Sequence, residues 1–432
     1  MKAAEFKANL EELTPKQRKV LNAFLAGQSD IAIAAYLGVE SSTIRRHLTN
    51  ICKAFGLNNE AGEHYSYRED LTDLFIQYRP ELVQPTVLNS KASLEPEFPG
   101  SPLALASPFY ISRSPIEARC QQAIRKPGAL LRIRGPQCTG KTSLLHRIMA
   151  AAQWMGYYTV RLNIRQAESA CLASLDSFLQ WFCTHLSLKL NRPVQLESYW
   201  DQARFGSLVS CTTYVQAHLL GHLDQGLLLA LDDVDWLFEF PEIAQGFFTL
   251  LRSWHEDAKN LDVWQHLRLL VAHSTEAYIP LSVHQSPFNV GLPIRLSDLM
   301  RSQIETLVRC YRLDLTAIEI NQLMALVGGH PYLIQLALYH LHRDAIPFDT
   351  LLTTAPTQGG IYSPHLRRYW QTLNNHPPLL DALQQVIAAE PAAARLDPIL
   401  TYKLESMGLV HLKGNQVQVS CDLYRDYFRP PT

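Results

Sequence analysis

The octapeptide Gly-Pro-Gln-Cys-Thr-Gly-Lys-Thr at residues 135–142 constrains the fold of this chain more than any other segment. Its glycines, Gly135 and Gly140, let the backbone wrap closely around an anion with amide N–H groups pointing inward. Lys141 can place its charge on the β- and γ-phosphates of a nucleotide, and the Thr142 hydroxyl can bind Mg²⁺. With Ser143 next in the chain, these residues predict a phosphate-binding loop.

The segments on both sides of this loop support the interpretation. Residues 129–134 have the pattern of a short buried strand, and residues 143–149 have the apolar spacing of a helix. Strand, loop and helix is the order that the motif requires, because the helix must present the positive end of its dipole to the phosphates. A chance match is the alternative, and the context argues against it.

A second motif supplies acidic groups. Residues 227–231 are an uninterrupted apolar run, as in a strand buried on both faces, and Asp232-Asp233-Val234-Asp235 follows directly. Asp232 would hold Mg²⁺, directly or through water, and Asp233 would polarise the attacking water. Glutamate is usual at the second position, so the shorter Asp233 predicts slow hydrolysis or a need for a partner. The alternative is a strand that ends in a polar turn.

Five strand signals, mostly separated by helical segments, predict an α/β core: a parallel sheet with helices on both faces. They lie at 129–133, 158–163, 227–231, 267–273 and 288–292. The fourth signal runs into Ser274 and Thr275, whose hydroxyl groups are candidates to sense the γ-phosphate or to orient water. Ordinary loop caps are the alternative at these positions.

The first block of the chain predicts a helix-turn-helix. A capping box with Thr14 as N-cap, Pro15 and Gln17 opens one helix, a second helix spans 30–37, and Gly38 lies in a tight turn. Ser41 or Ser42 is expected to cap a third helix over 43–55. The matching stretches, which resemble the LuxR-type DNA-binding module, include Leu13-Thr14-Pro15, Ile31-Ala32, Leu37-Gly38-Val39 and Ser42-Thr43-Ile44.

The solvent face of the third helix carries groups that can reach base edges or phosphates in a DNA major groove. These are Thr43, Arg45, Arg46, His47, Asn50 and Lys53, whereas Ile44, Leu48, Ile51 and Phe55 fall on the opposite face and are expected in the core. The alternative is that the charges are merely solvated, on a module reused for protein contact.

Composition sets wider limits. The 432 residues suggest two to four domains, and the net charge of −1 means that any contact with DNA must come from a local patch. Eight scattered cysteines without a C-x-x-C pair argue for a reducing cytosol, with neither a disulfide framework nor a zinc site. Without a signal pattern or a spanning apolar run, the protein is expected to be soluble and cytoplasmic, with no membrane partner.

The C-terminal part predicts further helices. Gly329-His330-Pro331 precedes an apolar helix, which a helix stop followed by a proline start would also explain. Helices are expected at 365–374, 378–389 and 397–407, followed by a hairpin around Gly414-Asn415, and this order predicts a winged helix. Arg367, Arg368 and Lys413 leave DNA contact possible there, as the second choice.

Residues 108–428 resemble a cyanobacterial family of AAA-like ATPases close to the STAND and origin-recognition branches. The matching stretches include Gly140-Lys141-Thr142-Ser143-Leu144-Leu145, Leu229-Ala230-Leu231-Asp232-Asp233-Val234-Asp235, Ser286-Pro287-Phe288-Asn289 and Gly328-Gly329-His330-Pro331-Tyr332-Leu333. The resemblance implies that Tyr110 and Arg113 lie by the adenine and that His330 and Pro331 start a helix beside the nucleotide. Asp233 and Cys138 depart from the family pattern.

Five domains are predicted: a helix-turn-helix at 1–57, a connector at 58–107, a P-loop ATPase core at 108–297, a helical lid at 298–356 and a winged helix at 357–432. Within the connector, a helix is expected at 65–78 and an extended linker at 85–102.

We interpret the chain as a switch in transcription or signal transduction, controlled by ATP or ADP with Mg²⁺. It would bind DNA, with self-association in the ATP state. The alternatives are a defence or transposition ATPase whose N-terminal module recruits a protein effector, and a scaffold that binds nucleotide without turnover.

Overall fold

The computed structural model describes residues 3–57, 67–83, 96–113, 115–274, 289–390, 392–414 and 416–430. The chain forms two compact units. The N-terminal unit comprises residues 1–96 and 103–111, and the C-terminal unit comprises residues 97–102 and 112–432. Across the described residues, no helix combines the length and the apolar character that a membrane crossing demands.

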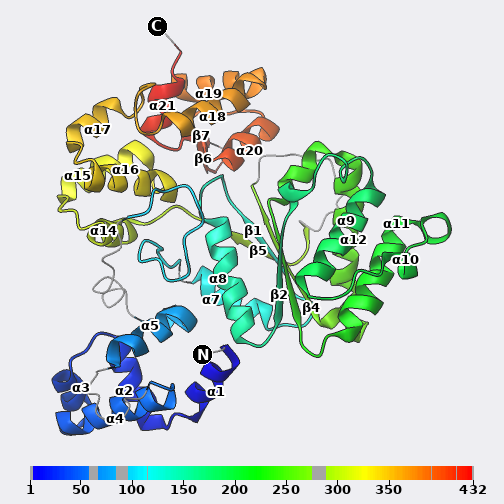
Figure 1. Ribbon diagram of the computed structural model, residues 1–432. Coiled ribbons are helices and arrows are strands. Elements are labelled where there is room, and N and C mark those ends of the chain that lie inside the picture. Colours follow the sequence, from blue (N-terminus) through cyan, green and yellow to red (C-terminus); the bar gives the residue numbers. More distant parts are fainter. Residues whose placement is uncertain are drawn as a thin grey trace. The chain divides into compact units, whose positions relative to one another are not determined.

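The N-terminal unit is helical (Figure 1). Its helices are α1 (Ala3–Glu12), α2 (Pro15–Leu25), α3 (Asp30–Leu37), α4 (Ser41–Ala54), α5 (Arg68–Tyr78) and the short η1 (Pro80–Leu82). The predicted capping box of α2 is confirmed, with Thr14 and Gln17 bonded reciprocally. Gly38 takes the left-handed conformation, with φ of 65°, that the turn requires.

The start of α4 differs from the prediction. Its N-cap is Glu40, without a side-chain capping bond, so the expected serine cap is wrong. Ser42 instead donates its hydroxyl hydrogen to the Glu40 carboxylate, over 3.1 Å, and is thereby engaged away from the backbone. The predicted core face is confirmed, because Ile44, Leu48 and Ile51 are fully buried.

An aromatic cluster joins α1 and α5 to the helix-turn-helix. The ring of Phe6 lies 4.9 Å from that of Phe55 and 5.0 Å from that of Phe75, and all three side chains are buried. The helix at α1 was not predicted. The expected packing of the 65–78 segment on a neighbour is confirmed from Arg68 onward, while residues 65 and 66 lie outside the described residues.

The C-terminal unit is built on a five-stranded parallel sheet in the order β2-β3-β4-β1-β5. The strands are β1 (Leu130–Arg134), β2 (Tyr158–Asn163), β3 (Leu227–Asp232), β4 (Leu267–His273) and β5 (Leu292–Arg295). Four of the five strand predictions are confirmed to within a residue at each end.

The fifth strand begins where the prediction ended it. Gly291 has φ of 74°, a left-handed conformation that interrupts a strand, and residue 288 lies outside the described residues. Pro293, which has no N–H, is tolerated within β5 because this strand is at the edge of the sheet. Glycine at 291 is required by a close approach, since a Cβ there would lie 2.5 Å from the Leu130 carbonyl oxygen.

Helices cover both faces of the sheet, as predicted (Figure 1). Leu227, Leu229 and Leu231 of β3 pack in one apolar cluster, whereas Leu228 and Ala230 pack in a second cluster on the other face. The first cluster includes α9 (Leu175–Lys189) and α12 (Pro241–Asp257), and the second includes α7 (Ile116–Ile124) and α8 (Lys141–Trp154). The other elements here are η2 (Ile164–Gln166), α10 (Leu196–Tyr199), α11 (Gln202–Thr213), η3 (Tyr214–Leu219), η4 (Leu220–His222), η5 (Val234–Glu239) and α13 (Asp262–Gln265).

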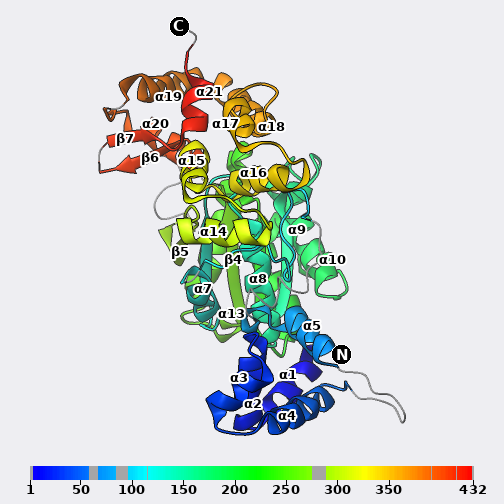
Figure 2. The ribbon, with the colours of Figure 1, turned by 90° about the vertical axis from the view of Figure 1, so that its left-hand side faces the viewer.

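Eight helices and a hairpin follow the sheet in the described part of the chain (Figure 2). They are α14 (Arg301–Cys310), α15 (Ala317–Val327), α16 (Pro331–Arg343), α17 (Phe348–Thr354), α18 (Ser363–Asn374), α19 (Pro377–Ala389), α20 (Pro398–Met407), β6 (Val410–Lys413), β7 (Gln416–Val419) and α21 (Asp422–Phe428). The predicted helices and the antiparallel hairpin are confirmed, with Gly414 at φ of 63°, whereas Asn415 lies outside the described residues. The assignment of this region as a lid and a winged helix stays a prediction.

Candidate nucleotide-binding site

The loop between β1 and α8 has the backbone that its glycines predict. Gly140 is the N-cap of α8 with φ of 93°, and a Cβ on Gly135 would lie 2.9 Å from Thr139 Oγ1. Thr139 itself donates a 2.8 Å hydrogen bond to the Pro136 carbonyl, and Cys138 also has a positive φ of 58°. The first turn of α8, with Lys141, Thr142 and Ser143, therefore begins directly at the loop, where the positive end of the helix dipole favours an anion.

Lys141 is buried in this loop. Its ammonium donates hydrogen bonds to the carbonyl oxygens of Gly135, over 2.9 Å, and Pro136, over 2.8 Å. A buried charge needs such partners, because desolvation without them is costly. A charged donor held at the centre of the loop is suited to bind an anion there.

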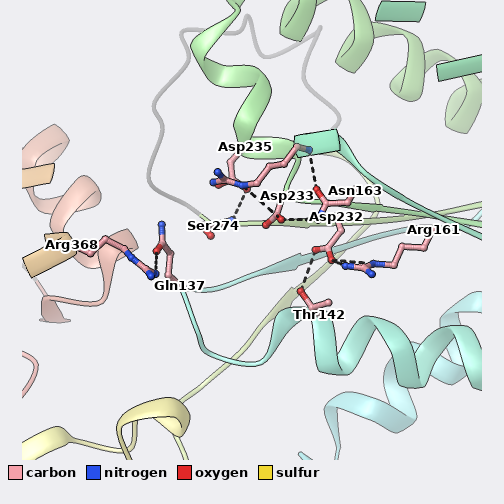
Figure 3. Close-up of polar contacts among 10 residues, drawn as sticks. Gln137, Thr142, Arg161, Asn163, Asp232, Asp233, Asp235, Ser274 and Arg368 are labelled. Carbon is pink, nitrogen blue, oxygen red and sulfur yellow. Dashed lines mark hydrogen bonds and ion pairs between the residues drawn. The ribbon is translucent and has the colours of Figure 1, made fainter. Parts of the chain in front are cut away.

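Asp232 faces the start of α8 from the end of β3 (Figure 3). Its Oδ1 atom lies 3.4 Å from Thr142 Oγ1, although β4 separates β3 from β1 in the sheet. Its Oδ2 atom accepts hydrogen bonds from Arg161 in β2. A hydroxyl and a carboxylate at this distance are oxygen ligands that suit Mg²⁺, so the pair fits the predicted metal site.

Asp233 has a different environment from that of its neighbour. Its backbone is left-handed, with φ of 54°, and its side chain is 34% exposed. The carboxylate accepts a 3.1 Å hydrogen bond from Asn163 Nδ2 and lies 3.8 Å from Arg165 Nε. A carboxylate that water can reach is suited to polarise a water molecule, but here its Oδ2 atom is shared by these two groups.

Ser274 lies at the end of β4, between the strands that carry the loop and the acids. It is buried, and its backbone N–H donates a 3.2 Å hydrogen bond to Asp235 Oδ1. Burial raises the pKa of the Asp235 carboxyl group above its usual value. The catalytic role of the Ser274 hydroxyl stays a prediction, and Thr275 lies outside the described residues.

Gln137 links the loop to the C-terminal helices. Its side-chain Oε1 accepts a 3.1 Å hydrogen bond from Arg368 of α18, as Figure 3 shows, and its carbonyl oxygen lies 3.2 Å from His330 Nε2. Burial lowers the pKa of His330 to about 4. Pro331 begins α16 directly after this histidine. The region predicted as a lid and a winged helix therefore contacts the phosphate loop.

The two residues expected by the adenine lie in different units. Arg113 belongs to the C-terminal unit and donates a 2.6 Å hydrogen bond to the Thr139 carbonyl in the loop. Tyr110 belongs to the N-terminal unit, in a turn where its N–H bonds to the Ser107 carbonyl over 3.2 Å. Contact of either residue with adenine stays a prediction.

The predicted DNA-contacting side chains occupy the outer face of α4. Arg45, Arg46, Asn50 and Lys53 are exposed, and Thr43 and His47 are half-buried. Arg45 Nε lies 3.5 Å from Asp30, which also forms a two-point ion pair with Arg68 of α5. The other cations of this face are Arg46 and Lys53. They lie on the exposed side of α4, whose opposite side is buried in the helical core.

Sequence reasoning missed the partners of the acids and of the loop. Arg161 and Asn163 stand at the carboxyl end of a predicted strand, and their position beside an acidic strand end was a usable signal. Arg165 follows two residues later. Gln137 and Arg368 gave no such signal, because a single arginine on a distant helix cannot be assigned to a loop from the sequence.

Comparison with protein families agrees with this architecture. The model of the AAA-like domain matches residues 98–430, and the chain belongs to this family. A second model, that of the luxR family of bacterial regulatory proteins, matches residues 11–62. The chain therefore combines an AAA-like domain with a LuxR-type helix-turn-helix. No curated protein matches the chain significantly.

One solved structure has the same fold as the larger part of the chain. The Walker-type ATPase PABY2304 of Pyrococcus abyssi is similar with a TM-score of 0.52 and 12% identity, over 74% of this chain and 96% of that one. ORC1 of Aeropyrum pernix in complex with DNA aligns with a TM-score of 0.38 and 13% identity, over 80% and 96%. Cdc6p of Pyrobaculum aerophilum aligns with a TM-score of 0.33 and 15% identity, over 74% and 96%. The first of these carries the conclusion that the fold is that of a P-loop ATPase.

Proposed function

We propose that this protein is a DNA-binding regulator whose state is set by an adenine nucleotide bound with Mg²⁺. The observation that carries the proposal is the approach of Thr142 Oγ1 to within 3.4 Å of Asp232 Oδ1, beside a glycine-lined loop at a helix start. The loop N–H groups, Lys141 and Arg113 supply the positive field for the phosphates. Thr142 and Asp232 would hold Mg²⁺, which would supply positive charge against that of the phosphates.

The contacts of the C-terminal helices with the loop support control by the nucleotide. Arg368 and His330 both bond to Gln137, and a Cβ on Gly408 would lie 2.8 Å from Pro136. Phosphates that draw Lys141 away from the Gly135 and Pro136 carbonyl groups would alter the loop on which these contacts rest. ATP and ADP must prefer different arrangements of this region, because equal affinities for both would shift nothing.

Hydrolysis is proposed to be slow. Asp233 is one methylene shorter than the glutamate that usually activates water, and Asn163 and Arg165 share its carboxylate. The Asp233→Asn variant should bind ATP as the wild type does, while phosphate release falls to background. Wild-type protein that binds ATP but releases no phosphate would make the nucleotide a structural ligand instead.

The decisive experiment compares DNA binding by the full chain with ATP, with ADP and without nucleotide. Duplex DNA selected by the wild type from a random-sequence library is the probe, and fluorescence anisotropy gives the dissociation constant at fixed salt. A difference of fivefold or more is expected, since coupling free energies are roughly 1–3 kcal/mol. Identical affinities in all three conditions would refute coupling, and no DNA binding in any condition would favour an adaptor that recruits a protein effector.

A further inference from the structure

Arg161 forms an ion pair with the buried acid of the candidate magnesium site. Its Nη2 and Nε atoms lie 2.7 and 3.3 Å from Asp232 Oδ2. The Asp232 side chain is 2% exposed, and that of Arg161 is 33% exposed. A charge-assisted contact to a carboxylate removed from water is stronger than a surface ion pair, because the solvent screens it little.

The two oxygens of this carboxylate have separate partners. Oδ1 lies toward Thr142, over 3.4 Å, and Oδ2 bonds to Arg161, so that Asp232 stands between the two residues in Figure 3. The guanidinium and a metal ion beside Thr142 therefore do not compete for the same oxygen. Arg161 offsets the negative charge of Asp232 and leaves Oδ1 for Mg²⁺.

This arrangement changes what the metal has to do. A buried carboxylate without a counter-charge would repel the phosphates of an incoming nucleotide, and a bound Mg²⁺ would be needed to offset both. Here a side chain of the protein already offsets the charge of the acid. Part of the negative charge that Mg²⁺ would otherwise have to offset is therefore already balanced in the protein without nucleotide or metal.

We propose that Arg161 is a permanent counter-charge for Asp232, which lowers the dependence of nucleotide binding on Mg²⁺. The inference rests on the proposed nucleotide site and specifies how that site tolerates the absence of metal. Arg161 acts through Asp232, so it is a positioning residue that need not touch the nucleotide. The consequence is a protein that retains its nucleotide when Mg²⁺ is scarce.

The test measures the dissociation constant of ADP by isothermal titration, once in EDTA and once in excess Mg²⁺. The value in EDTA is divided by the value in Mg²⁺, so a larger ratio means that binding depends more on the metal. In Arg161→Gln this ratio should rise by about 5- to 150-fold over the wild type, the range of typical coupling between two sites. Arg161→Lys keeps the charge and should stay near the wild-type ratio. Arg204→Gln, which removes an exposed arginine of the same unit, is the matched control and should not change it.

An unchanged ratio in Arg161→Gln, with ADP bound normally by the wild type, overturns the inference and leaves the proposed function intact. Wild-type protein that binds no nucleotide in either buffer overturns the proposed function itself. Arg161→Gln that folds only with Mg²⁺ supports the inference. If the single variant does not fold at all, the double variant Arg161→Gln with Asp232→Asn is tested, because it removes both charges of the pair. A folded double variant then supports the counter-charge, and an unfolded one shows that Arg161 is needed for packing and overturns it.

Discussion

The phosphate loop and the helix α4 are both polar sites at a helix, but they are organised in opposite ways. At the candidate nucleotide site, several polar groups are bonded to residues from other elements: Asp232 at the end of β3 to Arg161 of β2, and Gln137 of the loop to Arg368 of α18. On α4, the exposed cations belong to one continuous face, and the opposite face is buried in a local helical core.

This difference predicts where changes have large effects. A charge that is buried and bonded from several sides costs much to alter, because each partner is left unsatisfied. A solvated charge costs little in stability and acts on a ligand in proportion to its own electrostatic contribution. The loop should therefore respond to single substitutions, and the helix face to combined ones.

Lys141→Ala should have the largest effect. Its two hydrogen bonds to carbonyl groups indicate the number of bonds it offers to phosphates, and bonds of a charged group contribute about 1.5–3 kcal/mol each. The dissociation constant for ATP should rise by about 100-fold or more, since about 1.4 kcal/mol is a factor of ten. Isothermal titration measures this change, with the exposed Lys126→Ala as the control. A rise of less than fivefold in the dissociation constant would mean that the loop tolerates substitution as well as the helix face does, and would contradict the contrast between the two sites.

Arg45→Ala combined with Arg46→Ala should come next. The dissociation constant for selected DNA should rise about 30-fold at physiological salt, and the slope of log affinity against log salt should fall by about 1.8. Lys16→Ala combined with Lys19→Ala removes the same charge from exposed positions of α2 and should change less. Equal losses of DNA affinity in both double variants would mean that binding follows net charge. If Arg45→Ala with Arg46→Ala keeps its DNA affinity but loses a protein partner, the module is an adaptor.

His330 should make stability depend on pH. Its pKa is about 4 because burial disfavours the charged form, whereas an unfolded histidine titrates near 6.5. Between these values the unfolded state binds more protons, so stability falls as pH drops from about 6.5 to about 4. At pH 5.5 the loss from this residue is about 1.4 kcal/mol. Urea unfolding of His330→Gln at pH 7.5 and 5.5 should show a correspondingly smaller difference than the wild type. An equal difference would place the pH response in other buried groups, such as His273.

Thr14→Ala should have the smallest effect of the series. Loss of a helix N-cap costs about 1 kcal/mol, and the capping box of α2 is made within one turn. Hydrogen exchange of the α2 amides in the full chain reports this local loss. The exposed mid-helix Thr49→Ala should change the exchange of its own helix less. Destabilisation that spreads to the β-sheet would contradict the local organisation assigned to this unit.

The two kinds of site were also predictable to different degrees. The capping box at Thr14, the turn at Gly38 and the glycines of the loop follow from local rules, because each requires a residue type within a few positions. The strand at β5 was misplaced, since Gly291 and Pro293 interrupt the pattern and only an edge position makes the proline acceptable. The serine cap of α4 failed because Ser42 bonds to Glu40 instead.

The local parts follow from the order of residues alone: a strand, a glycine-lined loop and a helix in that order, an acidic strand end, and a LuxR-type helix-turn-helix. Such features depend on hydrophobic periodicity and on backbone preferences of a few residues. Which charges pair depends instead on how the elements pack. Arg161 reaches an acid 71 positions away and Arg368 reaches a loop 231 positions away. Such pairs are set by the order of strands in the sheet and by the packing of the C-terminal helices. Neither can be read from the hydrophobic periodicity of the sequence.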